Sequence, residues 1–230
     1  MDVTLLRRSV FNASQQLWMA SPWAEYCLRL GVGSPTSLLT DLPGGPPELA
    51  PIRQWLPAYR RESWARGLEA QRVPPPARED AGPRLDAAFR AQQRTFCPPY
   101  PDAVYAVERA SREHRLALTT NGPGDVQRAK LRVSGLSRFF PVVVVSAEIG
   151  SGKPESPMFR SALDRLGVRA DEAVVVGDSV ERDIAGAVGV GIVSVLVDRS
   201  RAPAPRDSGA NVTIATLADL PSALATLSAS

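Results

Sequence analysis

The stretch that decides the fold is Val174-Val175-Val176-Gly177-Asp178-Ser179-Val180-Glu181-Arg182-Asp183. Its three valines predict a short buried strand, and Gly177 marks where that strand ends. Asp178 then lies at the carboxyl end of the strand, and Asp183 lies in the first turn of the helix that follows. Ligands bind beyond the carboxyl ends of strands in an open parallel sheet, and paired carboxylates there suit a hard cation such as Mg²⁺. The alternative is purely structural: Asp178 or Ser179 caps the helix, and Asp183 favours the positive end of its dipole.

The composition is that of an ordinary globular protein. The chain has 230 residues, of which 44% are hydrophobic, and a formal net charge of +3. This length allows one large domain or two small ones. Its arginines are scattered along the sequence, whereas a nucleic-acid binder concentrates basic residues on one face, so we expect no nucleic-acid partner. Lys130 and Lys153 are the only lysines, which draws attention to either one in a predicted site.

The two cysteines and the amino-terminal residues bear on location. Cys27 and Cys97 are too few for a disulfide framework or a zinc cluster and fit a reducing compartment. No run of about 20 apolar residues predicts a membrane span, and the first residues do not form a signal peptide. We therefore expect a cytoplasmic protein without a membrane partner. The sequence leaves its oligomeric state open.

The first part of the chain is expected to be helical. Residues 1–8 are too short to form a strand and a turn together. Residues 9–97 show apolar residues at helical spacing and no strand pattern, with helices expected over 9–30 (broken at Ser21-Pro22), 52–72 and 83–96. The proline-rich stretches 31–51 and 73–83 are expected to be loops.

From residue 98 onward, apolar runs alternate with helical patterns. Strands are expected over 116–120, 142–146, 173–176 and 192–197, with helices over 102–114, 124–134, 155–166 and 181–188. Continuous apolar strands that alternate with helices predict a parallel sheet covered on both faces. Residues 98–230 are thus expected to form a doubly wound α/β domain, with 9–97 as an all-helical insertion near its start.

Three of the expected strands lead into polar residues that could meet at one edge of the sheet. They are followed by Thr120-Asn121-Gly122, by Lys153-Pro154 and by Gly177-Asp178. Each also reads as an ordinary turn, loop or cap. Together they offer a hydroxyl with backbone N–H groups, a cation and a carboxylate, a set suited to a phosphoryl group and Mg²⁺. The sequence does not fit a Walker A loop, because Ala147 replaces its first glycine and Pro154 its Ser/Thr.

These three motifs, in this order and spacing over about residues 98–200, resemble the second, third and fourth motifs of the haloacid dehalogenase-like hydrolase superfamily. The helical insertion resembles that family's cap domain. The resemblance implies Mg²⁺-dependent hydrolysis, most often of a phosphate monoester. It implies that Thr120, with Asn121 and Gly122, binds the phosphoryl oxygens and that Lys153 neutralises charge. It also implies that Asp178 binds the metal and that Asp183 supports it.

The family's first motif is an apolar strand that ends in Asp-x-Asp-x-Thr, and here only its tail is matched. Asp2-Val3-Thr4-Leu5 makes Asp2 the general acid and base and a metal ligand, with the nucleophile one position before Met1. In a second register Asp2 is itself the nucleophile and Thr4 the residue two positions on. The first register is favoured because Thr-Leu-Leu usually follows Asp-x in the motif. Residues 1–8 are thus expected to be a remnant of the first motif.

In either register the strand that precedes the motif, a central one in this fold, is apparently missing. We therefore expect a native start upstream of Met1, with an apolar run that ends in Asp, and little or no phosphatase activity from the chain as numbered.

Three other functions stay open. A non-catalytic relative would keep the phosphate and metal sites but only bind. A dehalogenase of the same superfamily is disfavoured by Asp2 at the acid position of the favoured register, because those enzymes usually lack this residue. An interaction module built on residues 9–97 is possible, but no feature of that segment specifies a partner. The substrate, which the resemblance implies to be a small phosphorylated metabolite, cannot be identified further.

Overall fold

The computed structural model describes residues 3–32, 37, 39–95, 97–200 and 208–228, and the chain divides into two compact units. The first unit comprises residues 1–97, 121–133 and 145–150, and the second comprises residues 98–120, 134–144 and 151–230. Asp2 lies outside the described residues. None of the helices within the described ranges is both long and apolar enough to cross a membrane.

The regular secondary structure of the first unit is helical, apart from Val145, the last residue of a strand of the second unit. Its elements are α1 (Val3–Met19), α2 (Ala24–Arg29), the 3-10 turn η1 (Pro47–Leu49), α4 (Ala50–Ala70), α5 (Pro75–Thr95), α7 (Gly124–Val133) and α8 (Ser146–Ile149). The interruption expected at Ser21-Pro22 falls between α1 and α2. Helix α1 already begins at Val3, so residues 3–8 are helical. Whether residues 1–8 are the remnant of a first motif stays a prediction.

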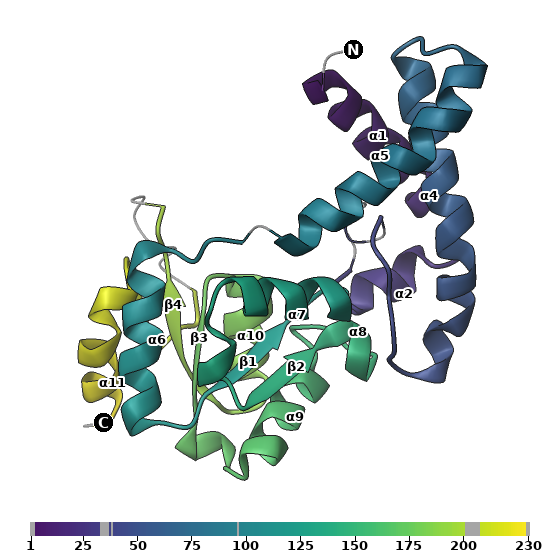
Figure 1. Ribbon diagram of the computed structural model, residues 1–230. Helices are drawn as coiled ribbons and strands as arrows, with labels where there is room; N and C mark the ends of the chain where they lie inside the picture. Colours follow the sequence, from purple (N-terminus) through teal and green to yellow (C-terminus); the bar gives the residue numbers. More distant parts are fainter. Residues whose placement is uncertain (1–2, 33–36, 38, 96, 201–207, 229–230) are drawn as a thin grey trace. The chain divides into compact units, whose positions relative to one another are not determined.

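The loop predicted over residues 73–83 is wrong. Helix α5 begins at Pro75, a position where proline costs no hydrogen bond because the first helical N–H groups have no partner within the helix. It then continues through Pro83 to Thr95 (Figure 1). The proline run was interpreted as a stop signal, whereas only Val73 and Pro74 separate α5 from the turn that ends α4.

The core of the first unit forms where α1 packs against α4. Gly67 of α4 permits this approach, because a Cβ atom at that position would overlap Val10 of α1. The buried Tyr59 hydroxyl donates to the carbonyl of Ser14, 3.0 Å away, and so joins the two helices. Burial raises the pKa of Tyr59 to about 12, despite hydrogen bonding to Ser14 and Ser63. Tyr59 thus serves the packing of α1 against α4.

The second unit has an α/β fold. Its elements are α6 (Pro101–Glu113), β1 (Ala117–Thr120), η2 (Ser137–Phe139), β2 (Val142–Val145, whose last residue is grouped with the first unit), α9 (Ser156–Leu166), η3 (Ala170–Glu172), β3 (Val174–Gly177), the π-helical turn η4 (Val180–Ile184), α10 (Ala185–Val188), β4 (Val193–Val197), β5 (Val212–Ile214), η5 (Leu217–Asp219) and α11 (Leu220–Ser228). The predicted alternation of apolar strands and helices over residues 98–230 is confirmed, and α8 and α11 are additional helices that the pattern did not predict.

The described strands form two sheets, where the sequence predicted one (Figure 1). Strands β3, β4 and β5 pair in parallel in that order, with Val176 opposite Val195 and Leu196 opposite Thr213. Strands β1 and β2 form a separate two-stranded sheet. The expectation that a central strand is missing stays a prediction.

Asp102 of α6 fixes the carboxyl-terminal part of the second unit. Its carboxylate accepts hydrogen bonds from the Thr216 hydroxyl at 2.6 Å and the Leu217 N–H at 2.8 Å, and it pairs with Arg199 at 2.9 Å. These partners, the Thr216 hydroxyl first, hold the pKa of Asp102 below its usual range. Helix α6 is thereby tied to the turn that leads into α11.

Candidate functional site

Lys153 and Asp183 form the centre of the candidate site in the second unit. The lysine Nζ lies 2.6 Å from Asp183 Oδ1 and donates to the backbone carbonyl of Thr119 at 3.1 Å. Both side chains are largely buried, with 14% of Lys153 and 8% of Asp183 exposed. Burying a charged pair is tolerated where each group has further hydrogen-bond partners, which this arrangement supplies. The pair connects the carboxyl end of β1 with the turn that follows β3.

Gly177 and Ser179 orient the Asp183 carboxylate from the other side. The Ser179 N–H donates to Asp183 Oδ2 at 3.1 Å. Gly177 is required at the end of β3 because a Cβ atom there would overlap the Asp183 side chain. Asp183 therefore turns back toward the strand end, and each of its oxygens contacts a donor of the protein. This geometry suits a carboxylate that orients its neighbours, the supporting role that the resemblance implies for Asp183.

Thr120 and Asp178 each lie next in the chain to residues that contact Lys153 or Asp183. Thr120 follows Thr119, whose carbonyl accepts from Lys153, and Asp178 lies between Gly177 and Ser179, which both adjoin Asp183. The structure thus brings together the chain segments that carry Thr120, Lys153 and Asp178. The individual roles assigned to Asp2, Thr120, Lys153, Asp178 and Asp183 stay predictions.

The oxygen donors of this segment are compatible with a hard divalent cation. Asp178 and Asp183 supply carboxylates at the carboxyl end of β3, and Mg²⁺ is typically bound through one or two carboxylates with water and substrate oxygens. Within the part of the chain that the structure describes, which excludes Asp2, no three His, Cys, Asp or Glu side chains form a metal-binding group. A site with two protein carboxylates is what these residues can provide.

Asn121 and Gly122 belong to the first unit, where Ser146 holds them in place. The fully buried Ser146 hydroxyl accepts a hydrogen bond from the Gly122 N–H at 2.9 Å. Gln127 Nε2 donates to the Asn121 carbonyl at 3.2 Å. Gly122 has φ of +138°, a conformation open to glycine but strained for other residues. Because its N–H donates to Ser146, Gly122 contributes the shape of this turn, and the phosphate-binding role expected of it stays a prediction.

Gly31 packs against the same turn. It follows α2 with φ of +64°, and a Cβ atom there would overlap the Asn121 side chain. The sequence pattern places Gly31 in a loop and indicates no role for Ser146. Ser146 could have been noticed because it directly follows the apolar run 142–145, at the end of a predicted strand. Nothing in the sequence relates Gly31 to Asn121, since the two residues come from segments 90 positions apart.

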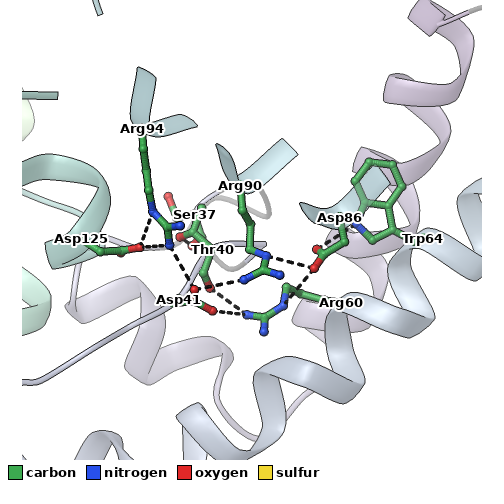
Figure 2. Close-up of polar contacts among 9 residues, drawn as sticks. All are labelled: Ser37, Thr40, Asp41, Arg60, Trp64, Asp86, Arg90, Arg94 and Asp125. Carbon is green, nitrogen blue, oxygen red and sulfur yellow. Dashed lines mark hydrogen bonds and ion pairs between the residues drawn. The ribbon is translucent and has the colours of Figure 1, made fainter. Parts of the chain in front are cut away.

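A network of arginines and aspartates joins α4, α5 and α7 in the first unit (Figure 2). Asp41 contacts three guanidinium groups, those of Arg60 at 3.1 Å, Arg90 at 3.2 Å and Arg94 at 3.1 Å. Arg94 also pairs with Asp125 of α7, and its Nε lies 3.0 Å from the aspartate oxygen. The network therefore connects α5 to the helix that begins just after the Asn121-Gly122 turn.

The same network changes the acidity of Asp41. Partial burial opposes ionisation of its carboxyl group, but the charge of Arg60 and the hydrogen bonds and charge supplied by Arg94 and Arg90 outweigh that effect. They hold the pKa of Asp41 below its usual range. On the other side of the network, Asp86 receives hydrogen bonds from Arg90 at 3.0 Å and from the Trp64 indole N–H at 3.1 Å. Each acid in this cluster is thus bound by at least one donor from another part of the unit.

Together, the α/β fold and the buried lysine–aspartate pair beyond the ends of β1 and β3 define an α/β protein with a charged site at its strand ends. A model of the haloacid dehalogenase-like hydrolase family matches residues 48–191. A phosphoserine phosphatase of Thermus thermophilus is 36% identical over 201 residues, which cover 86% of this chain and 76% of that protein. The chain belongs to the haloacid dehalogenase-like hydrolase family.

Two further similar proteins match different shares of the chain. A glyceraldehyde 3-phosphate phosphatase of Methanopyrus kandleri is 36% identical over 127 residues, so the match spans about half of each protein (53% and 54%). The crystal structure of a 2-haloacid dehalogenase from Pseudomonas syringae has a TM-score of 0.59, with 97% of this chain and 90% of that one covered, at 22% identity. At that identity the second likeness concerns the fold alone.

Proposed function

We propose that the chain is a Mg²⁺-dependent phosphatase that acts on a small phosphorylated metabolite. The observation that carries the proposal is the buried Lys153–Asp183 pair beside Thr119 at the ends of β1 and β3. Family membership makes the chain a hydrolase, and the phosphatase names of relatives such as the Thermus protein favour a phosphate monoester. The likeness to the dehalogenase supports no particular reaction, because it shows the fold alone.

The proposed mechanism assigns one task to each residue. The Thr120 hydroxyl donates a hydrogen bond to a phosphoryl oxygen, and the Lys153 ammonium offsets the negative charge that gathers on the phosphoryl group. Asp183 keeps Lys153 in position through its 2.6 Å contact. Asp178, with Asp2 and Asp183, holds Mg²⁺, which when bound spreads the charge of the phosphoryl oxygens.

Asp2 determines whether the chain as numbered can complete the reaction. In the favoured register Asp2 protonates the leaving alcohol and later takes a proton from water. The carboxylate that attacks phosphorus and carries the aspartyl phosphate then lies outside the 230 residues. We therefore propose that this polypeptide binds phosphate and Mg²⁺ but has little turnover. In the second register Asp2 is the nucleophile and Thr4 takes the position of the acid.

The first experiment tests the site through binding. Mg²⁺ and inorganic phosphate together should raise the melting temperature of the chain, since ligands that bind only the folded state stabilise it. The Asp178→Asn variant should lose most of this shift. Asp171→Asn is the matched control, because Asp171 is an exposed acid paired with Arg169 just before β3. Equal shifts in the three proteins would contradict the proposed site.

The second experiment measures turnover. Phosphate release from phosphoserine, glyceraldehyde 3-phosphate and other small monoesters is followed with Mg²⁺ and with EDTA, for this chain and for a form extended by an apolar run ending in Asp one position before Met1. We expect release from the extended form only, and only with Mg²⁺. Equal release from both forms would refute the favoured register of Asp2. Ligand binding with no release from either form would favour the non-catalytic alternative.

A further inference from the structure

The turn that follows β3 carries an exposed arginine, Arg182 of η4, with which no described carboxylate pairs. Its backbone N–H and its Nε–H both donate to the Ser179 hydroxyl, at 3.3 Å and 3.2 Å. The side chain makes no other hydrogen bond or ion pair with the residues that the structure describes. By contrast, Arg169 and Arg199 of the same unit each pair with an aspartate. The terminal nitrogens of Arg182 therefore keep their hydrogen-bonding capacity for a ligand.

The Ser179 hydroxyl orients the Arg182 side chain. This hydroxyl accepts both hydrogen bonds from Arg182 and donates to Glu181 Oε2 at 3.3 Å, so its proton and its lone pairs are all used. Side chains of a helical turn point back toward its amino-terminal end, and Ser179 is the residue at which this turn begins. The guanidinium group therefore lies at the end of η4 that adjoins the carboxyl end of β3, where Asp178 also lies.

The same serine connects Arg182 to the candidate site. Its N–H donates to Asp183 Oδ2 at 3.1 Å, and Asp183 Oδ1 contacts the Lys153 ammonium group at 2.6 Å. The turn is π-helical, and the N–H groups of Asp183 and Ile184 both donate to the Ser179 carbonyl, at 2.8 Å and 3.2 Å. Such turns are frequent at functional sites. The two cations thus lie at one strand end, with one carboxylate and one serine between them.

Lys153 and Arg182 differ in how much of their charge is available to a ligand. The Lys153 side chain is 14% exposed, and Asp183 already offsets its charge. Arg182 is exposed and has no carboxylate partner in the described part of the chain. An ammonium group binds anions as a point charge, whereas a guanidinium group offers a planar fork that matches the two oxygens of a carboxylate. A ligand whose phosphoryl group lies by Lys153 can therefore place a carboxylate against Arg182.

We propose that Arg182 determines substrate specificity by binding the carboxylate of a small phosphorylated acid. The inference rests on the proposed function, which places the phosphoryl group at Thr120 and Lys153, and it adds the chemical class of the rest of the substrate. One serine residue separates Arg182 from the Asp183–Lys153 pair, so the carboxylate and the phosphoryl group belong to one short molecule. A monoester with an uncharged tail leaves the Arg182 fork solvated and is bound through its phosphoryl group alone.

Two phosphonates that differ in this one group are the probes. 3-Phosphonopropionate carries a carboxylate, and propylphosphonate has a methyl group in its place. Neither contains an ester bond, so their binding with Mg²⁺ is measured by isothermal titration calorimetry whether or not the chain has turnover. We expect 3-phosphonopropionate to bind about fivefold to tenfold more tightly, between the effects of an exposed ion pair and of a charge-assisted hydrogen bond. Inorganic phosphate is the reference ligand for the phosphoryl site.

Two variants test the assignment to Arg182. Arg182→Gln should lose the preference for the carboxylate and still bind inorganic phosphate as the parent does. Arg160→Gln is the matched control, because Arg160 is an exposed arginine of α9 in the same unit, and it should keep the full preference. Both positions are exposed, so both variants should melt close to the parent without ligand. The preference of the parent is measured without any substitution, so the inference stays testable if a variant fails to fold.

Three results would overturn the inference alone. Equal binding of the two phosphonates by the parent would show that the site does not recognise the carboxylate. A preference that survives Arg182→Gln would assign the carboxylate to another residue, and a loss of inorganic phosphate binding in this variant would make Arg182 part of the phosphoryl site. In each case the parent still binds inorganic phosphate with Mg²⁺, so the proposed function holds. If the parent binds neither phosphonate nor inorganic phosphate, the proposed function fails and the inference fails with it.

Discussion

Replacing Ser146 with alanine should destabilise the turn that carries Asn121 and Gly122. The Ser146 hydroxyl is fully buried, and it is the partner of the buried Gly122 N–H, 2.9 Å away. Removing it leaves that N–H without an acceptor, which costs about 1–3 kcal/mol. Since 1.4 kcal/mol corresponds to a factor of ten, hydrogen exchange at the Gly122 amide should become about 5-fold to 140-fold faster.

Ser63 provides the matched control, because it is equally buried but makes a different kind of hydrogen bond. Its hydroxyl donates to the carbonyl of Tyr59 at 2.8 Å, four residues back within α4. That carbonyl is also positioned to accept the helical hydrogen bond of the backbone, so Ser63→Ala leaves no backbone group without a partner. Such hydroxyl bonds add little to helix stability, and we expect a change within about 0.5 kcal/mol.

The assay combines thermal melting with amide exchange at residue resolution, because a chain of two units need not unfold in one step. Ser146→Ala should lower the melting temperature by more than Ser63→Ala does and should accelerate exchange at Gly122. If both variants melt alike and the Gly122 amide keeps its exchange rate, Ser146 does not hold this turn, and the description of its geometry fails.

Three further predictions concern the first unit. The pKa of Asp41 is lower in the folded chain than in the unfolded chain, so its ionised form stabilises the fold above the unfolded pKa of about 3.9. This stabilisation is lost as the pH falls through the lower folded pKa. The melting temperature of Asp41→Asn should therefore be lower than that of the parent at pH 7, and the difference should shrink toward pH 3. Gly31→Ala should destabilise the unit by more than Gly44→Ala does, because both glycines have positive φ but only a Cβ at Gly31 would meet a neighbour; equal losses in urea unfolding would refute the contact with Asn121. Burial raises the pKa of the Cys27 thiol to about 11, so an alkylating reagent at pH 8 should modify Cys27 only after unfolding, and rapid labelling of the native chain at this residue would contradict its burial.

The sequence predicted most of what local pattern can determine. The valine runs located β2 and β3 to within one residue, because continuous β-branched residues have few other uses in a short apolar segment. The lysine–aspartate pair was also within reach, since its members follow two separate strands, Lys153 after β2 and Asp183 after β3. The extent of α5 could not be predicted, because a proline such as Pro75 can either end one helix or begin the next. Only its tertiary setting decides between the two.

Contacts that depend on backbone shape were beyond sequence reasoning. Gly177 has no side chain to suggest a role, yet it admits Asp183 against the end of β3. Gly31 does the same for Asn121 in the other unit. The Gly122 N–H donates to a serine 24 positions away, a pairing that the residue types alone do not indicate. In each case the decisive quantity is the space left by an absent Cβ or the direction of one N–H group, which a residue type alone does not specify.

The placement of β1 and β3 in two separate sheets bears on the candidate site. Lys153 is held by a β1 carbonyl on one side and by Asp183 on the other, so the position of its ammonium group depends on how far apart β1 and β3 lie. The ammonium group therefore keeps its place only while both strand ends keep theirs, so the site depends on the packing of the whole α/β unit rather than on any one motif.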